Sequence, residues 1–245
     1  MSQDPMTSTG PETRPLAGPG RRTVAAIHEM LERSDREVVL WIDFGGVISP
    51  SVGGSASGVA HLLGATWPEV YAASDDFART LGTTGLGPLE LGLLSQDAWV
   101  DEVLERLGSS LRADRLPERF EDVWYRGRGI DEEFYRALLG IRGSGVSMGV
   151  LTNSVAEWEQ PRRRMVDLDT DFDAVVRSHV VGLMKPDPGI FAYAQRQLGG
   201  LGALHVLVDD LERNCVGARA VGWEAIHHAD EVPIIVPAMR SELPR

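Results

Sequence analysis

Polar residues of four chemical types stand where short apolar runs end or just before a helical pattern begins. Asp43 is a candidate nucleophile, Thr152 offers a hydroxyl and Lys185 a cation. Asp209 and Asp210 form a pair of carboxylates. If the apolar runs are parallel strands, their carboxyl ends meet at one edge of a sheet, where ligands bind in open α/β folds. The spacing therefore predicts one site that contains all of these residues.

The chemistry that suits this set is phosphoryl transfer. A strand-end Asp43 followed by glycines presents a carboxylate that can attack phosphorus in line and form an aspartyl-phosphate, which water then breaks down. Thr152 and Lys185 would offer a hydroxyl and an ammonium to the phosphoryl oxygens, which is the electrostatic stabilisation that such a reaction needs. Asp43, Thr152 and Lys185 are the expected catalytic residues.

A divalent cation is expected at the same edge. Asp209 and Asp210 would crowd Asp43 with like charge, which is costly unless a cation neutralises it. A site built only from oxygen atoms suits Mg²⁺, which would also orient the phosphate and screen its charge. Each of these residues also has a structural alternative, since Asp43 could cap a turn, Thr152 could form one, and Asp210 could cap the next helix.

The elements that must position these residues can be read from the apolar pattern. Four runs are expected to be strands buried on both faces: 38–42, 148–151, 204–208 and 225–226. Helices are expected from about Thr23 to Arg33, from Pro188 to Gln197 with Asp187 as its cap, and from about Glu212 to Ala220. Strands that alternate with helices predict an α/β fold with a doubly wound parallel sheet.

The chain is expected to divide into a core and an insertion. Residues 1–20 are rich in Pro, Gly, Ser and Thr and are expected to form a disordered tail. Residues 21–49 and 141–245 would form the α/β core, and 50–140, which contain amphipathic patterns but no strand run, a helical cap inserted after the first core strand. The glycine-rich stretch 51–55 would be the hinge into the cap.

Composition limits the classes of partner. The 245 residues carry 36 acidic and 24 basic side chains, a net charge of −12, so nucleic acid and membrane surfaces are not expected as partners. No apolar run approaches the roughly 20 residues that span a bilayer. The single Cys215 fits a reducing compartment, and the cytoplasm is the expected location. The oligomeric state is left open.

These motifs together resemble the haloacid dehalogenase (HAD) superfamily, in particular capped phosphatase-like members similar to glucose-1-phosphatases and the N-terminal phosphatase of epoxide hydrolases. The resemblance covers about 37–228 and rests on Asp43 before Gly45-Gly46-Val47, on LTNS, on GLMKPDP and on VLVDDLERN followed by GARAVG. It implies a Rossmann-like core, a small phosphorylated metabolite as substrate, and Mg²⁺ held by Asp43, the Gly45 carbonyl, Asp209 and Asp210. It also implies substrate binding by Thr152, Asn153 and Lys185.

One position departs from the family pattern. Most phosphatases of this kind have a second Asp two residues after the nucleophile as general acid and base, and here that residue is Gly45. Such groups contribute about 10²–10⁴-fold, so a replacement or an easily released leaving group is needed. His61 and Glu90 are conceivable replacements. Anomeric sugar phosphates and acyl phosphates are expected to react better than alkyl phosphates.

Two other functions stay open. Gly45 is compatible with a divergent member that binds a phosphorylated ligand or a protein partner without turnover. The dehalogenase branch needs no metal and lacks the carboxylate pair at Asp209 and Asp210, so this pair argues against it. The cap aromatics Trp67, Tyr71, Trp99, Trp124 and Tyr125 could line a pocket or form cap core, and Arg79, Arg126 and Arg128 could bind a second anion or be solvated.

Overall fold

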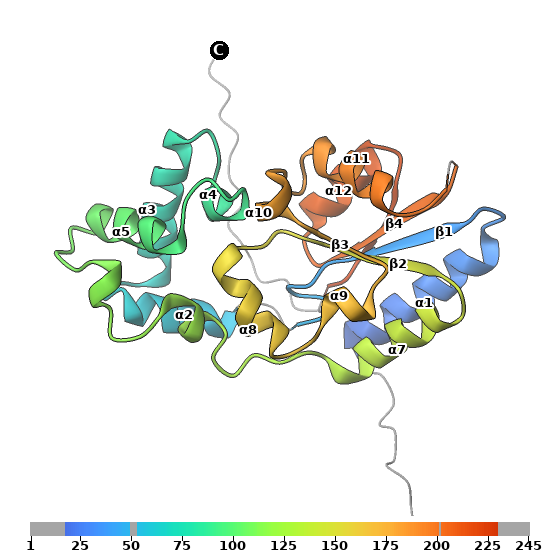
Figure 1. The fold of residues 1–245 in the computed structure, drawn as a ribbon, viewed down its shortest axis with the longest axis horizontal. Helices are drawn as coiled ribbons and strands as arrows, with labels where there is room; N and C mark the ends of the chain where they lie inside the picture. The colour runs from blue at the N-terminus through green and yellow to red at the C-terminus, as the bar shows by residue number, and fades with distance from the viewer. Residues whose placement is uncertain (1–17, 50–52, 201, 230–245) are drawn as a thin grey trace, which may run out of the picture.

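The computed structural model describes residues 18–49, 53–200 and 202–229, and its centre is a five-stranded parallel sheet (Figure 1). The strands are β1 (Val38–Ile42), β2 (Ser147–Thr152), β3 (Ala174–Arg177), β4 (Leu204–Asp209) and β5 (Glu224–His227). Their order across the sheet is β3-β2-β1-β4-β5. Strands β2 and β4 lie on either side of β1 and run parallel to it. The polar residues that follow these three strands therefore gather at the carboxyl end of the sheet.

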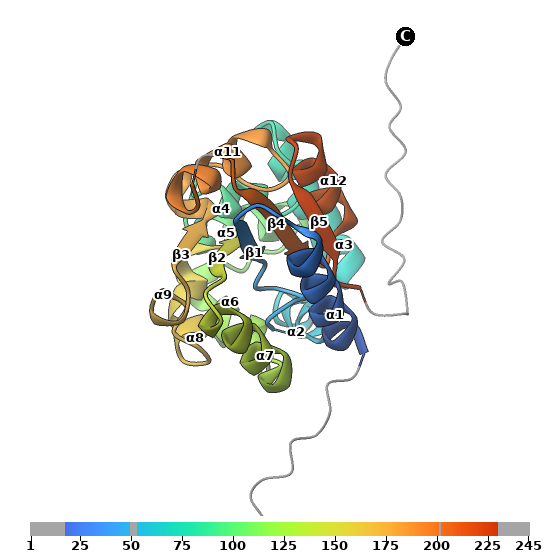
Figure 2. The same ribbon diagram turned by 90° about the vertical axis from the view of Figure 1, so that its right-hand side faces the viewer.

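Helices cover both faces of this sheet, as expected from strands that are apolar on both sides. Along β1, Val38, Leu40 and Ile42 pack with one apolar cluster, while Val39 and Trp41 pack with another. The first cluster is covered by α1 (Gly18–Arg33), α7 (Glu132–Gly143) and α9 (Leu168–Asp171). The second is covered by α11 (Pro188–Gln197) and α12 (Glu212–Ala220) on the opposite face (Figures 1 and 2). The predicted doubly wound α/β fold is confirmed.

A helical unit is inserted between β1 and β2. It contains α2 (Gly53–Leu62), α3 (Trp67–Thr80), α4 (Gly87–Glu90), α5 (Gln96–Arg106), the 3-10 turn η1 (Ala113–Arg115) and α6 (Phe120–Trp124). These elements share a separate apolar cluster, which Val155 and Trp158 after β2 also join, and they lie to one side of the sheet in Figure 1. We call α2 to α6 the insertion.

The boundary between the insertion and the core follows these clusters. Most of helix α7 lies in the range 50–140, which the sequence assigns to the cap, yet Phe134, Leu138 and Ile141 of α7 pack in the first apolar cluster of the sheet. Helices α1 and α7 also contact each other. The short elements η2 (Ala156–Trp158), α8 (Glu159–Arg163) and α10 (Ser178–Val181) follow β2 and β3.

Several local expectations differ from the structure. The sequence does not predict strand β3. This strand lies at one side of the sheet and has only four residues, most of them half-buried, so its apolar pattern is weak. Strand β5 is the edge strand on the other side of the sheet. The sequence predicts that it is buried on both faces, but its residues are half-buried or exposed. Helix α1 begins at Gly18 rather than near Thr23; residues 1–17 of the expected tail and 51–52 of the expected hinge lie outside the described residues.

The helices of the described ranges include none with the length and apolar character needed to cross a membrane.

Candidate active site

Asp43 lies immediately after β1, at the carboxyl edge of the sheet. Its backbone N–H donates to the carbonyl of Val208 at 2.9 Å, so the residue is tied to the end of β4. The chain then turns sharply, with the Gly46 N–H donating to the Ser49 carbonyl at 2.7 Å. Gly46 has a φ of +80°, and a Cβ there would lie 2.0 Å from Oδ2 of Asp210. A glycine at this position is therefore needed for both the turn and the place of Asp210.

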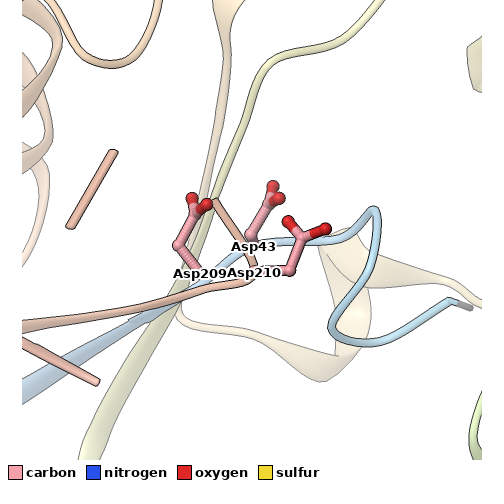
Figure 3. A group of neighbouring side chains, drawn as sticks. All are labelled: Asp43, Asp209 and Asp210. Carbon is pink, nitrogen blue, oxygen red and sulfur yellow. The ribbon is translucent and has the colours of Figure 1, made fainter. Parts of the chain in front are cut away.

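The carboxylates of Asp43, Asp209 and Asp210 come together as the sequence predicts. Each offers an oxygen atom, and these atoms lie within 4.8 Å of one another. Figure 3 shows the three side chains projecting in the same direction from the ends of β1 and β4. Asp209 is fully buried, and its Oδ1 accepts hydrogen bonds from the Leu211 N–H and from Asn214 Nδ2, both at 2.9 Å.

Lys185 provides the positive charge within this cluster. Its Nζ lies 3.0 Å from Oδ1 of Asp43 and 2.6 Å from Oδ2 of Asp209, and it donates to the Leu151 carbonyl at 2.7 Å. Burial alone would lower the pKa of Lys185, but the two carboxylates hold it above its usual range, so the ammonium stays charged. Lys185 is also the single lysine of the chain, all other basic side chains except histidines being arginines.

Thr152 and Asn153 end β2 beside this cluster. Thr152 is buried, and its hydroxyl lies 3.3 Å from the Asn153 carbonyl. Asn153 holds the segment around Lys185 in both directions: its Oδ1 accepts from the Lys185 N–H at 2.8 Å, and its Nδ2 donates to the Lys185 carbonyl at 3.0 Å. Asn153 therefore fixes the backbone from which the buried ammonium extends.

The electrostatics of the carboxylates fit a divalent cation. Burial, opposed by Lys185 and reinforced by Asp209, raises the pKa of Asp43 to about 6. Burial together with the charges of Asp43 and Asp209 raises the pKa of Asp210 to about 8. One ammonium thus leaves the three carboxylates with excess negative charge, and an all-carboxylate donor set is one that Mg²⁺ prefers. The residues present fit this cation.

Gly45, two residues after Asp43, has free space where a side chain would lie. A Cβ built on Gly45 meets no heavy atom within 4 Å. Of the two replacement acids that the sequence suggested, His61 is exposed in the last turn of α2. Glu90, at the end of α4, is half-buried and its Oε2 lies 3.5 Å from Asn153 Nδ2. Only Glu90 of these two is shown in contact with a residue of the candidate site.

The cap residues that could have lined a pocket mostly have structural partners. Trp99 and Trp124 are buried in the core of the insertion, with Trp67 and Tyr125 packed against it. Arg79 pairs with Asp75 and Arg126 with Glu118. The aromatic residues thus mostly form the core of the insertion, except for Tyr71, which is exposed. Arg79 and Arg126 are solvated as well as paired, and the Arg128 guanidinium lies over the Tyr125 ring at 5.3 Å.

Asn214 braces the carboxylate of Asp209 and is not among the site residues expected from the sequence. It lies five residues after Asp209, on the first turns of α12, and it is buried with its amide donating to the Asp209 carboxylate. The DDLERN run was the available signal, but helical spacing alone does not tell whether such a side chain braces the loop or faces solvent.

The sequence of the chain shows which protein family it belongs to. The sequence model of the haloacid dehalogenase-like hydrolases matches residues 54–222, more than half of the chain. The chain belongs to this family. The matched range of this HAD-like protein contains Thr152, Lys185 and the carboxylate pair of β4, and it starts after Asp43.

Individual relatives of this HAD-like protein agree with the family. It is 29% identical over 103 residues to a sesquiterpene phosphatase of Aspergillus oryzae, covering 42% of this chain and 52% of the relative. It is 33% identical over 106 residues to a pyrimidine 5'-nucleotidase of Escherichia coli, covering 41% and 47%. The chain spans about half the length of the curated relatives it matches.

The fold of this HAD-like protein is similar to that of a HAD family enzyme from Bacteroides thetaiotaomicron. The TM-score is 0.61 at 16% sequence identity, covering 79% of this chain and 94% of the other. The same enzyme has been crystallised with magnesium and inorganic phosphate, and that structure matches with a TM-score of 0.57 at 17% identity over 78% of this chain and 93% of the other.

Proposed function

We propose that this protein is a Mg²⁺-dependent phosphomonoester hydrolase that acts on a small phosphorylated metabolite through an aspartyl-phosphate at Asp43. The observation that carries the proposal is the contact of Lys185 Nζ with both Asp43 and Asp209, at 3.0 and 2.6 Å, beside Asp210. The arrangement supports the proposal because it brings a carboxylate, a fixed ammonium and a further pair of carboxylates together at the carboxyl end of the sheet. The relatives named as a phosphatase and a nucleotidase support the same substrate class.

In this mechanism the ammonium of Lys185 keeps Asp43 ionised and lies beside the oxygens that gain charge as phosphorus is attacked. Asn153 and the Leu151 carbonyl hold that ammonium in place. Thr152 would donate its hydroxyl to a phosphoryl oxygen. Mg²⁺, held by Asp43, the Gly45 carbonyl, Asp209 and Asp210, would neutralise carboxylate and phosphate charge.

The cytoplasm is the compartment we infer. Cys215 is a free, buried thiol, which a reducing environment preserves.

The test is hydrolysis of a panel of phosphate esters, including sugar 1-phosphates and an aryl phosphate, with Mg²⁺ or EDTA. We expect turnover that needs Mg²⁺ and that falls by at least about 10³-fold in kcat/KM for Asp43→Asn. The matched control is Asp35→Asn, which should leave the rate unchanged. Asp35 is exposed and precedes the N-terminal end of β1. A folded protein that binds Mg²⁺ but hydrolyses no ester would contradict the proposal and favour a ligand-binding descendant.

A further inference from the structure

Phosphoester hydrolysis requires a proton for the leaving oxygen and later a base for the attacking water, and the groups around Asp43 differ in their ability to provide them. The ammonium of Lys185 is held in its charged form by two carboxylates. Asp209 is occupied by Lys185, Asn214 and the Leu211 N–H. These groups are already committed to charge balance and structure, so an exchangeable proton needs another carrier.

Glu90 is an acidic side chain of the insertion that contacts the candidate site. Its carboxylate reaches from the insertion to Asn153 Nδ2 at 3.5 Å, and Asn153 in turn holds Lys185, which contacts Asp43. The residue before it, Leu89, is 1% exposed in the apolar cluster of the insertion. Neighbouring residues on a helix point about 100° apart, so Glu90 does not share the direction of the buried Leu89. Its contact with Asn153, just after β2, places its carboxylate beside the sheet.

Contacts of two residues, Gly92 and Gln96, hold this part of the insertion against the core. After α4, Gly92 approaches α10 so closely that a Cβ on it would lie 2.6 Å from the His179 carbonyl. At the start of α5, Gln96 accepts a hydrogen bond from Trp158 Nε1 at 2.8 Å, and its N–H donates to Glu157 at 2.9 Å. Glu90 precedes both contacts by a few residues, so its position is set by the docked insertion.

The surroundings of Glu90 favour proton exchange near neutral pH. Burial raises the pKa of Glu90 to about 7, with Asp43 raising it further and Arg213, Lys185 and Asn153 opposing the rise. Two helices pack against α4: α10 carries His179, which is hydrogen-bonded to the Ser154 hydroxyl, and α5 carries Asp97, Asp101, Glu102, Glu105 and Arg106. The charges that shift the pKa of Glu90 come instead from Asp43, Lys185 and Arg213.

We propose that Glu90 is the general acid and base of this hydrolase, supplied by the insertion in place of a side chain at Gly45. The inference rests on the proposed function. As Asp43 attacks phosphorus and the bond from phosphorus to the ester oxygen breaks, the protonated Glu90 gives its proton to that oxygen, releasing an alcohol. Water then attacks the aspartyl-phosphate, Glu90 takes the proton of the water, and the bond from phosphorus to Asp43 breaks, which releases phosphate.

The experiment compares an alkyl phosphate with an aryl phosphate whose phenolate leaves without protonation, in wild type, Glu90→Gln and Glu105→Gln. Glu105 is an exposed glutamate on α5 and serves as the matched control. We expect Glu90→Gln to lower kcat/KM for the alkyl ester by about 10²–10⁴-fold while that for the aryl ester stays within a few fold. Its aryl reaction should show a burst of phenolate, because breakdown of the aspartyl-phosphate has lost its base.

Two further readouts separate acid-base catalysis from a structural role of Glu90. In wild type, kcat/KM for the alkyl ester should fall above about pH 7, where Glu90 loses its proton, and this limb should vanish in Glu90→Gln. A Gly45→Asp substitution, which has open space for its side chain, should restore alkyl turnover to Glu90→Gln by at least tenfold.

The outcomes distinguish this inference from the proposed function. Equal losses for both esters in Glu90→Gln would indicate a binding role and overturn the inference, as would unchanged alkyl turnover. In either case, aryl turnover that still needs Mg²⁺ and Asp43 would leave the proposed function intact. An absence of turnover on every ester in wild type would overturn both.

Discussion

The edge of the sheet and the insertion hold their charged side chains in different environments. At the edge, Lys185 and Asp209 pair with both side chains fully buried. In the insertion, a pair such as Arg126 with Glu118 leaves both side chains half in solvent. Buried charges need complete pairing and hydrogen bonding, whereas exposed pairs contribute little because water screens them.

This difference separates the tasks of the two regions. The edge confines charge at considerable cost, which is characteristic of a site that reacts with a charged ligand. The insertion is held together by apolar packing, and its solvated charges are replaceable. Some carboxylates of the insertion are less solvated: Asp75 and Glu121 are buried, each beside an exposed arginine. Glu90 is half-buried, and burial raises its pKa to about 7, with Asp43 of the edge adding to the rise.

The largest effect should come from removing the buried cation. Lys185→Met leaves the carboxylates of Asp43 and Asp209 uncompensated, and we expect a loss of about 3–5 kcal/mol in the free energy of unfolding. Urea denaturation without Mg²⁺ measures it. The control is Arg126→Met in the insertion, expected to cost less than about 1 kcal/mol. Similar losses in both variants would remove the distinction between the two regions.

A smaller effect is expected from a glycine at the edge. Gly46→Ala would drive a methyl group into Asp210 Oδ2 and strain a left-handed backbone, so Mg²⁺ affinity should fall by about 10–100-fold. Isothermal titration with Mg²⁺ measures this. Gly45→Ala, whose Cβ has open space and whose backbone is not left-handed, should change the affinity much less. If Gly46→Ala bound Mg²⁺ as wild type does, Asp210 would not be a ligand at the place described.

The smallest effect concerns the contact that docks the insertion. Gly92→Ala would meet the His179 carbonyl and shift Glu90 slightly, so alkyl ester kcat/KM should fall by about three- to tenfold, less than the roughly 10²-fold that a 1 Å misplacement costs. Gly108→Ala carries the matching strain, with φ of +70° against +67° for Gly92, but its Cβ has no atom within 4 Å. Equal losses in both variants would trace the effect to backbone strain instead of docking.

Most of the fold and of the edge could be predicted from the sequence because strand periodicity and strand ends are local signals. Helix α12 spans Glu212–Ala220 as expected, and α11 begins at Pro188 with Asp187 accepting a hydrogen bond from the Gly189 N–H. The edge strands carried less signal, since β3 and β5 bury little and their apolar runs are only three and two residues long. The amphipathic pattern of helix α7 does not show which region the helix belongs to, because the same apolar stripe could pack against the sheet or against the insertion.

By itself, the sequence determined that Asp43, Thr152, Asp209 and Asp210 share one edge, because parallel strands bring all their carboxyl ends to the same side. Only the tertiary structure decided that Lys185 bridges Asp43 and Asp209, and that Glu90 rather than His61 reaches Asn153. These contacts join segments far apart in the chain. The contacts of Lys185 depend on where the loop before α11 lies over the sheet, and the contact of Glu90 depends on how the insertion docks. No local pattern of residues encodes either geometry.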